Sequence, residues 1–277
     1  MWKSLFDKDE FQFAGFERGR TASKYVDSLS DNDLKELNGL LRWNCFTVDA
    51  HGRRFGRPAG PGKREAPQVV PDPRILELHK RFDLSDKHVL EFGCFEGVHT
   101  IGLAMFAKQV TGVDSRIENV VKAMVRCSFF GCAPTLFKCD LEDARDAALL
   151  PEADVVHHVG VLYHLVDPVT HLLKMSKYCR HGLMLDTHYS HVEKADKSYM
   201  VNGRSFRYFA YKEGGREDVF SGMGDHAKWL TLETLKSLLS EIGFGEIQVV
   251  ENYEQRNGPR MRLFAQRGRA SDTGAAH

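Results

Sequence analysis

The chain has 277 residues, of which 42% are hydrophobic and 27% are charged. This composition is typical of a globular protein with enough apolar material for a buried core. Lysine and arginine together number 38, as do aspartate and glutamate, so no overall positive field attracts nucleic acid or a membrane surface. Binding to nucleic acid would therefore require a local basic patch.

The cysteines and the amino-terminal residues indicate a cellular compartment. The six cysteines form no C-x-x-C pair, which predicts reduced and mostly buried thiols. The first residues lack an apolar signal core, and no stretch approaches the roughly 20 apolar residues that span a bilayer. We therefore expect a cytoplasmic protein without a membrane partner. No feature of the sequence determines the oligomeric state.

An N-terminal extension, residues 1–73, is predicted to combine a helical part with a basic loop. Ser30 is expected to cap a helix that has acidic residues in its first turn. The apolar stripe of this helix comprises Leu34, Leu37, Leu40 and Leu41. The basic stretch that follows, residues 51–73, is broken by glycine and proline. It favours a solvated loop over a phosphate-binding patch.

Residues 74–267 alternate between short apolar runs and helical segments, as in an α/β domain. The predicted strands cover residues 88–92, 109–113, 134–138, 154–160 and 182–186. A helix over 232–242 and a hairpin near 247–250 and 261–265 complete the domain. This order predicts a parallel sheet covered on both faces, with ligands at the carboxyl ends of its strands. The small polar tail, residues 268–277, is expected to be disordered.

Residues 189–228 are rich in glycine, aromatic and charged residues and show no clean periodicity. A segment of this length inside a compact domain is more often a functional lid than an idle loop. We predict that Tyr208, within this segment, and Trp229, just after it, contact an acceptor through their flat apolar faces. A small satellite core is the alternative, favoured for Phe206 and Phe209.

The most informative stretch runs from His88 to Thr100, where a buried strand meets glycines and then a helix. Gly93 and Gly97 permit positive φ and close approach of a ligand, and the helix start supplies unpaired N–H groups. Asp114 ends the second strand about twenty residues further on, a spacing at which its carboxylate can accept both ribose hydroxyls. Glu91 and Asp140 end two other strands. Together these acids suit a ribose, an adenine amino group and a cationic cofactor.

A nicotinamide dinucleotide is the competing cofactor. Its G-x-G-x-x-G pattern fails because Phe95 and Glu96 occupy positions that a pyrophosphate would crowd, and the glutamate would repel a diphosphate.

Over residues 87–266 the chain resembles the class I S-adenosylmethionine-dependent methyltransferases. Glu91-Phe-Gly-Cys-Phe-Glu-Gly97 matches their D/E-x-G-x-G-x-G loop except that Phe95 replaces the middle glycine. The resemblance implies a Rossmann-like sheet of seven mostly parallel strands, the last antiparallel, with helices on both faces and S-adenosylmethionine as cofactor. It assigns to the cofactor Glu91, Gly93, Cys94, Phe95, Gly97, Asp114, Ser115, Arg116, Asp140, Leu141, Val159 and Gly160.

A second motif, Gly160-Val-Leu-Tyr-His164, resembles a subgroup that includes the bacterial tRNA wobble-uridine carboxymethyltransferases. By this resemblance Tyr163 approaches the transferred group. An arginine of that subgroup meets the transferred carboxylate, and Arg260 has its position. Its other partners align only loosely around Trp43, so a carboxylated cofactor is not inferred. Arg260 and Trp43 are instead predicted to bind the acceptor.

Methyl transfer to a hydroxyl needs an in-line approach and a base. His164 and His188 follow adjacent central strands, so we expect both to face one cleft beside Tyr163, with Asp186 orienting either imidazole. The sequence leaves open which histidine is the base. No metal site is predicted, since His157 and His158 point to opposite faces of one strand.

These features predict an enzyme that methylates a hydroxyl of a small molecule or sugar. The first alternative is a tRNA wobble-uridine modifying enzyme, which the neutral net charge disfavours. The second is a non-catalytic cofactor-binding or interaction protein, which the departure at Phe95 allows.

Overall fold

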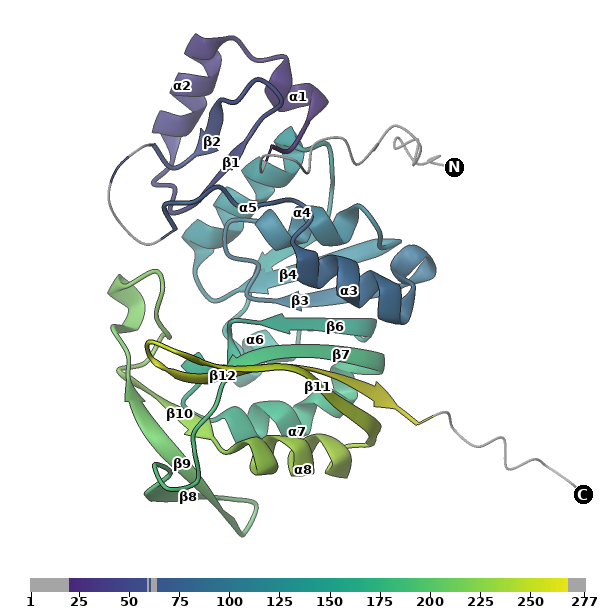
Figure 1. Cartoon of the computed structure of the whole chain (residues 1–277), viewed down its shortest axis with the longest axis vertical. Helices are drawn as coiled ribbons and strands as arrows, with labels where there is room; N and C mark the ends of the chain where they lie inside the picture. The colour runs from purple at the N-terminus through teal and green to yellow at the C-terminus, as the bar shows by residue number, and fades with distance from the viewer. Residues whose placement is uncertain (1–19, 59, 61–63, 269–277) are drawn as a thin grey trace, which may run out of the picture.

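The structure is a computed structural model and describes residues 20–58, 60 and 64–268. Apart from Gly268, the predicted tail lies outside the described residues, as do residues 1–19. Figure 1 shows an N-terminal lobe at one end, a central sheet, and a small second sheet beside α7 and α8. None of the helices in the described part of the chain is both long and apolar enough to cross a bilayer.

The N-terminal lobe, residues 20–58, contains two helices and two short strands. Its elements are α1 (Lys24–Asp27), α2 (Asp31–Leu40), β1 (Phe46–Val48) and β2 (Arg54–Gly56). The predicted cap of α2 is confirmed, since the Ser30 hydroxyl accepts from the Asp33 amide and the Asp33 carboxylate accepts from the Ser30 amide. The antiparallel pair β1–β2 departs from the expectation of a helical part followed by a basic loop. Strands of three residues are too short to produce a readable alternation.

The central sheet has seven strands in the order β11-β12-β7-β6-β3-β4-β5. The strands are β3 (His88–Phe92), β4 (Gln109–Asp114), β5 (Thr135–Lys138), β6 (Ala153–Val159), β7 (Cys179–His188), β11 (Phe244–Gln255) and β12 (Gly258–Arg267). The first five run parallel, and β12 is antiparallel to both of its neighbours. The predicted mostly parallel sheet with an antiparallel last strand is therefore confirmed.

Helices cover both faces of this sheet. They are α3 (Pro73–Phe82), α4 (Val98–Ala104), α5 (Ile117–Phe129), α6 (Ala144–Ala147), α7 (Pro168–Tyr178) and α8 (Leu232–Glu241). Val89 of β3 packs with Leu78 of α3, whereas the next residue, Leu90, belongs to the core that contains Leu172 of α7 and Leu238 of α8. Successive strand residues thus fill two separate cores, as the alternation of side chains requires.

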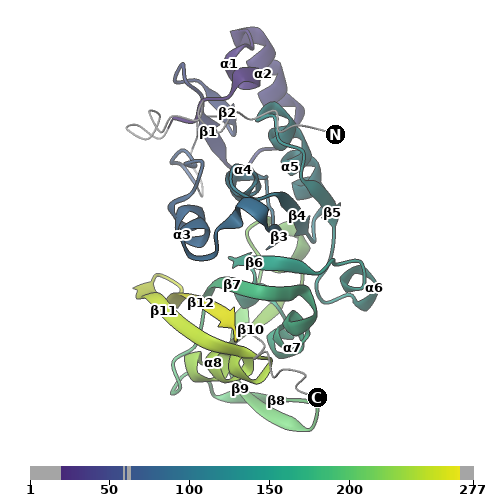
Figure 2. The ribbon, with the colours of Figure 1, turned by 90° about the vertical axis from the view of Figure 1, so that its right-hand side faces the viewer.

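The segment after β7 forms a second, antiparallel sheet of three strands, β8 (Lys197–Val201), β9 (Arg204–Lys212) and β10 (His226–Leu230). Figures 1 and 2 show this sheet at the opposite end of the molecule from the N-terminal lobe. Only Phe206 is fully buried in β9, so the sequence carries no clean alternation there. The connection between β9 and β10 includes the short 3₁₀ turn η4 (Gly215–Glu217) and extends toward the carboxyl ends of the central strands.

Candidate active site

A cavity of about 490 Å³ lies at the carboxyl ends of the parallel strands. Its walls come from the turns after β3, β4, β5 and β6, from residues 219–223 and from the β11–β12 hairpin. The volume falls within the roughly 300–1,000 Å³ of small-molecule and cofactor sites. A ligand site is predicted from the sequence at this location, the carboxyl ends of the parallel strands.

The turn after β3 forms one wall of the cavity. Gly93 has a φ of +75°, and a Cβ at this position would lie 2.4 Å from Cγ2 of Val161. Gly97 has a φ of +82° and begins α4, but it does not line the cavity. The amides of Gly93 and Cys94 both donate to the Val113 carbonyl, at 2.8 and 2.9 Å. These contacts hold the turn against the end of β4. The positive φ and the close approach of Val161 favour glycine at position 93.

Phe95, at the position of the middle glycine of the family pattern, has a left-handed backbone conformation. Its φ is +48°, in the left-handed region that bulky residues rarely adopt. Its amide donates to Oδ2 of Asp114 at 3.1 Å, and its ring lies 5.8 Å from the ring of Phe220. Phe95 lines the cavity, whereas the neighbouring Glu96 is fully buried outside it. The predicted repulsion between Glu96 and a diphosphate is therefore wrong.

Asp114 reaches the cavity from the end of β4. Its Oδ1 accepts hydrogen bonds from the Arg116 amide at 2.9 Å and from the Asn119 side chain at 3.0 Å. Burial raises the pKa of Asp114, and the hydrogen bonds to its carboxylate oppose that rise. Ser115 and Arg116 line the cavity beside it. Other predicted cofactor residues on its walls are Cys94, Asp140, Leu141, Val159 and Gly160.

Glu91 lies beneath the turn and not at the cavity surface. Its Oε2 accepts from the Thr100 hydroxyl at 2.6 Å, and its Oε1 has no hydrogen bond from any described residue. Burial raises the pKa of Glu91 to about 8, and the nearby Asp114 carboxylate adds to the rise. The structure therefore places Glu91 as a support of the turn, one layer below the cavity.

Arg74 and His99 line the cavity near this turn, and the sequence analysis missed both. Arg74 Nη2 lies 3.1 Å from His99 Nε2, and Asp72 pairs with both side chains. Burial alone would raise the pKa of Asp72, but hydrogen bonds from Arg74 and His99 hold this pKa well below the usual range. Neither residue belongs to a recognisable motif, because only the approach of α3 to α4 brings them together.

His157 and His158 lie on opposite faces of β6, as predicted. The His157 ring is 5.2 Å from the His99 ring, whereas His158 Nε2 is 2.9 Å from His171 Nε2. Glu91, His99 and His157 each place one potential ligand atom within 4.8 Å of the others. A cation among these three would face the guanidinium group of Arg74, which already contacts His99.

His164 lines the cavity and forms a hydrogen-bonded pair with Glu213, which is not among the lining residues. His164 Nδ1 lies 2.8 Å from Glu213 Oε1, and the His164 side chain is 20% exposed. Glu213 is buried, and its Oε2 also accepts from the Ser221 hydroxyl and from the Gly222 amide. Glu213 lies just after β9, in the segment without periodicity, and no sequence motif identified it.

His188 occupies a different environment from His164. It is buried and does not line the cavity, and its Nδ1 lies 3.1 Å from the Pro259 carbonyl oxygen. Its ring stacks on Trp229 at 4.8 Å, and Trp229 stacks in turn on Tyr211 at 4.4 Å. Burial lowers the pKa of His188, and Arg260 lowers it further. The predicted placement of both histidines in one cleft holds for His164 and fails for His188.

Asp186 pairs with arginines and not with an imidazole. Its Oδ1 accepts from Arg260 Nε at 2.6 Å and its Oδ2 from Arg74 Nη1 at 3.2 Å. Arg260 also lies 5.4 Å from the centroid of the Tyr163 ring, and both of these side chains line the cavity. The expectation that Asp186 orients a histidine is therefore wrong, and Glu213 has that geometry instead.

The remaining predicted acceptor residues lie away from the cavity. Trp43 is buried in the N-terminal lobe, 5.5 Å from the Phe55 ring. Trp229 is 2% exposed, and its indole nitrogen donates to the Tyr163 carbonyl. Tyr208 packs on Tyr199 in the small sheet. Burial removes Trp43 and Trp229 from contact with an acceptor, and Tyr208 does not line the cavity.

The cavity has the volume and the polar groups that could hold S-adenosylmethionine. Gly93 and Gly160 both have positive φ, and their bare backbones leave room against the turn and the end of β6. The Asp114 carboxylate could accept hydrogen bonds from ribose hydroxyls. Arg74 could supply a cation for the cofactor carboxylate.

Comparisons with known proteins agree with this geometry. A family model described as a methyltransferase domain matches residues 64–249. The tRNA U34 carboxymethyltransferases of Marinobacter nauticus and Methylococcus capsulatus are 32% and 34% identical over 158 and 110 residues. These matches cover 54% and 38% of this chain but only 44% and 33% of the relatives.

Among solved structures, the N-terminal domain of EvdMO1, crystallised in the presence of S-adenosylhomocysteine and D-fucose, superposes with a TM-score of 0.68 at 23% identity. The match covers 86% of this chain and 95% of that domain, which establishes the common fold. Because the methyltransferase domain model matches most of the chain, this protein belongs to the methyltransferase domain family, an enzyme class whose cofactor is S-adenosylmethionine.

Proposed function

We propose that this protein transfers the methyl group of S-adenosylmethionine to a hydroxyl of a small, sugar-like acceptor. The observation that carries the proposal is the His164–Glu213 pair, in which His164 lines the same cavity as Asp114 and Glu213 holds its ring. A base in the cavity beside the cofactor residues is what transfer to a hydroxyl requires.

Three groups hold the cofactor in this proposal. Asp114 accepts hydrogen bonds from the ribose, and Arg74 and His99 pair with the carboxylate of the methionine end. The bound cofactor supplies an electrophilic methyl group on a sulfonium. The chain's own contribution is to orient the acceptor in line with that group and to exclude water from it.

His164 acts as the general base. Because Nδ1 faces the Glu213 carboxylate, the ring proton resides there, and Nε2 remains the acceptor for the proton of the substrate hydroxyl. No hydrogen bond from the described residues engages Nε2. Glu213 orients the ring and stabilises the imidazolium that forms. His188 is the weaker candidate because it is stacked in an aromatic column behind the wall.

The acceptor end of the cavity suits a hydroxylated ligand. Tyr253 is 41% exposed there, and its hydroxyl accepts from Gln255 at 3.2 Å. Arg260 and Tyr163 line the same end. An aromatic face beside several hydrogen-bonding groups is a common arrangement for binding a sugar. The presence of D-fucose in crystals of the EvdMO1 domain makes this sugar the first acceptor to test.

A second candidate is modification of a tRNA wobble uridine, which the two curated relatives favour. The basic run of the N-terminal lobe gives it little support. Arg53 pairs with Asp31 and Asp49 and donates to three backbone carbonyls, and Arg54 stacks on Phe46. These guanidinium groups are engaged within the chain, which weakens a phosphate-binding role.

Calorimetry followed by turnover tests the proposal. We expect S-adenosylhomocysteine to bind, NAD not to bind, and S-adenosylhomocysteine to form from S-adenosylmethionine when D-fucose or a related sugar is present. Binding of NAD alone would contradict the cofactor assignment. Turnover with tRNA but not with sugars would favour the second candidate. Cofactor binding without turnover on any acceptor pool would indicate a non-catalytic protein.

A further inference from the structure

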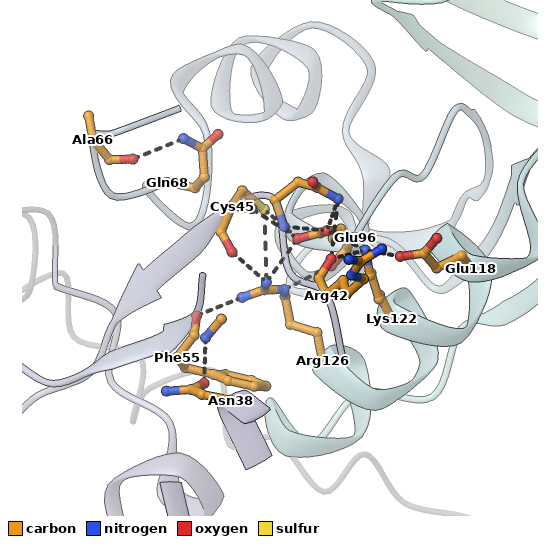
Figure 3. Close-up of polar contacts among 12 residues, drawn as sticks. Asn38, Arg42, Cys45, Phe55, Ala66, Gln68, Glu96, Glu118, Lys122 and Arg126 are labelled. Atoms are coloured by element: carbon orange, nitrogen blue, oxygen red, sulfur yellow. Dashed lines mark hydrogen bonds and ion pairs between the residues drawn. The ribbon is translucent and has the colours of Figure 1, made fainter. Parts of the chain in front are cut away.

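A buried network of charges joins the cofactor turn to the N-terminal lobe (Figure 3). Its centre is Glu96, which lies between Phe95 and Gly97 and is fully buried. Glu96 Oε1 accepts from the backbone and side-chain nitrogens of Asn44 at 2.7 and 2.9 Å. Its Oε2 accepts from the Cys45 amide at 3.1 Å. The side chain of one turn residue thus satisfies backbone donors of the segment that leads into β1.

Two cations of α5 complete the network, and both are fully buried. Lys122 Nζ lies 3.2 Å from Glu96 Oε1 and 2.6 Å from Glu118 Oε1, and Arg126 Nη2 lies 3.5 Å from Glu96 Oε2. Lys122 also donates to the Arg42 carbonyl. Two carboxylates therefore balance two cations, and the charges are hydrogen-bonded as burial requires.

Arg126 connects three chain segments by itself. Its Nε donates to the Glu96 carbonyl at 2.8 Å, its Nη1 to the Phe55 carbonyl at 3.1 Å, and its Nη2 to the Cys45 carbonyl at 3.2 Å. Gly56 leaves room for it, since a Cβ there would lie 2.8 Å from Nη2. One guanidinium group thus fixes the cofactor turn relative to the residues that lead into β1 and to β2.

A second connection runs from the lobe to the same turn. The Gln68 amide donates to the Phe46 carbonyl of β1 at 2.8 Å, and the Gln68 side chain lines the cavity. Arg64, from the same stretch, lies 4.5 Å from the centroid of the Phe95 ring. The lobe is therefore connected to the turn through Glu96, and the stretch that follows the lobe contacts the Phe95 ring through Arg64.

We propose that the N-terminal lobe is a positioning element for the cofactor turn, with Glu96 and Arg126 as its positioning residues. The network holds Phe95 in the left-handed conformation that aims its amide at Asp114, so docking of the lobe raises the affinity for the cofactor. Because such coupling is reciprocal, bound cofactor stabilises the lobe in return. This inference rests on the proposed cofactor site.

The coupling explains how the turn works without its middle glycine. A phenylalanine in the left-handed region persists only where surrounding contacts fix it. Here those contacts are the Asp114 carboxylate on one side and the Glu96 network on the other. If the lobe were not coupled to the turn, the turn would not need a buried ion pair at Glu96.

The test compares affinity for S-adenosylhomocysteine by calorimetry at a temperature where circular dichroism shows each variant folded. Arg126→Lys keeps the charge but loses the three-way geometry, and we expect its Kd to rise at least about tenfold. Asn38→Ala acts inside the lobe only, because Asn38 bonds the Arg54 carbonyl and the Gly56 amide. We expect a several-fold rise for it. Asn32→Ala, on the exposed face of the same helix, is the matched control.

Hydrogen exchange supplies the reciprocal measurement. In the wild type, S-adenosylhomocysteine should slow exchange of the β1 and β2 amides, and in Asn38→Ala this protection should shrink. Variants that melt earlier but bind with wild-type affinity would overturn the inference while leaving the cofactor site intact. If Arg126→Lys does not fold, Asn38→Ala decides. Absence of binding by the wild type would contradict the proposed function itself, and the inference with it.

Discussion

Glu213 Oε1 lies 2.8 Å from His164 Nδ1, although 49 residues separate them in the chain. Burial alone would raise the pKa of Glu213, but the hydrogen bonds from His164, Ser221 and Gly222 outweigh it and lower the pKa. Glu213 is therefore ionised at neutral pH. A buried carboxylate held by several donors fixes the orientation of the imidazole that it contacts.

The first prediction concerns this pair. His164→Ala should lower kcat about 10²–10⁴-fold, because the base is lost while the cofactor residues remain. Glu213→Gln should lower kcat less than His164→Ala does, because the neutral amide can still hold the ring through a hydrogen bond but no longer stabilises the imidazolium. Steady-state kinetics and calorimetry with S-adenosylhomocysteine separate loss of turnover from loss of binding.

The chain offers a matched control for that experiment. His191 and Glu254 form a second pair, with 2.7 Å between His191 Nε2 and Glu254 Oε1, outside the cavity. His191→Ala should leave kcat unchanged. A large effect of His191→Ala, or normal kcat in His164→Ala, would contradict the assignment of the base.

The fold was predictable because it rests on local patterns. Most residues of β3, β4, β6 and β7 are buried, whereas the edge strand β5 is partly exposed, and glycines and acids lie at or just after several strand ends. Ser30 and Asp33 form a cap whose signal lies within four residues. Each of these features depends on neighbours close in sequence.

The site was predictable only in part, because its other half depends on distant contacts. Arg74 lines the cavity and Glu213 contacts the cavity residue His164, and both come from segments without a motif, so no spacing indicated them. Trp229 is predicted to contact the acceptor because of its flat apolar ring, but the ring is buried between His188 and Tyr211. Asp186 is expected to orient a histidine, yet it lies opposite Arg262 in the sheet register and its carboxylate accepts from Arg260, two residues away on β12.

A second prediction tests the ribose contact. Asp114→Asn keeps the shape of the side chain but removes its charge, and a hydrogen bond to a charged group is worth ~1.5–3 kcal/mol. The Kd for S-adenosylhomocysteine should therefore rise about 10–100-fold. Asp86→Asn, at an exposed ion pair with Lys87, is the control and should bind normally. Equal affinity in the two variants would show that Asp114 does not hold the ribose.

A third prediction separates the two arginines that share Asp186. Arg74→Lys should weaken binding of S-adenosylhomocysteine about tenfold, because the fork that fits a carboxylate is lost. Arg260→Lys should raise the KM for the acceptor and leave the affinity for S-adenosylhomocysteine unchanged. Arg81→Lys, at a partly exposed pair with Glu246, should change neither. If Arg74→Lys and Arg260→Lys lowered the affinity for S-adenosylhomocysteine equally, the two arginines would act as one structural unit.

The last prediction concerns pH and stability, and it depends on Glu91. Burial raises its pKa from 4.5 to about 8, so between these values the folded protein binds more protons than the unfolded chain. The contribution of Glu91 to the free energy of unfolding is therefore fully present below pH 4.5 and is lost as the pH rises toward 8. The groups around Glu91 are Thr100, His157, His99 and Asp114.

Glu91→Gln removes this proton uptake while keeping an amide that fits the same space. The free energy of unfolding of the variant, relative to the wild type, should rise with pH across that window by about 1.4 kcal/mol for each pH unit at most. Denaturant unfolding at pH 5, 6.5 and 8 measures the difference, with Glu193→Gln, at an exposed carboxylate, as the control. Because His99 and His157 titrate in both proteins, their contributions cancel in the comparison. A difference that stays constant with pH would mean that Glu91 is ionised in the folded state, and the turn above it would then rest on a buried charge.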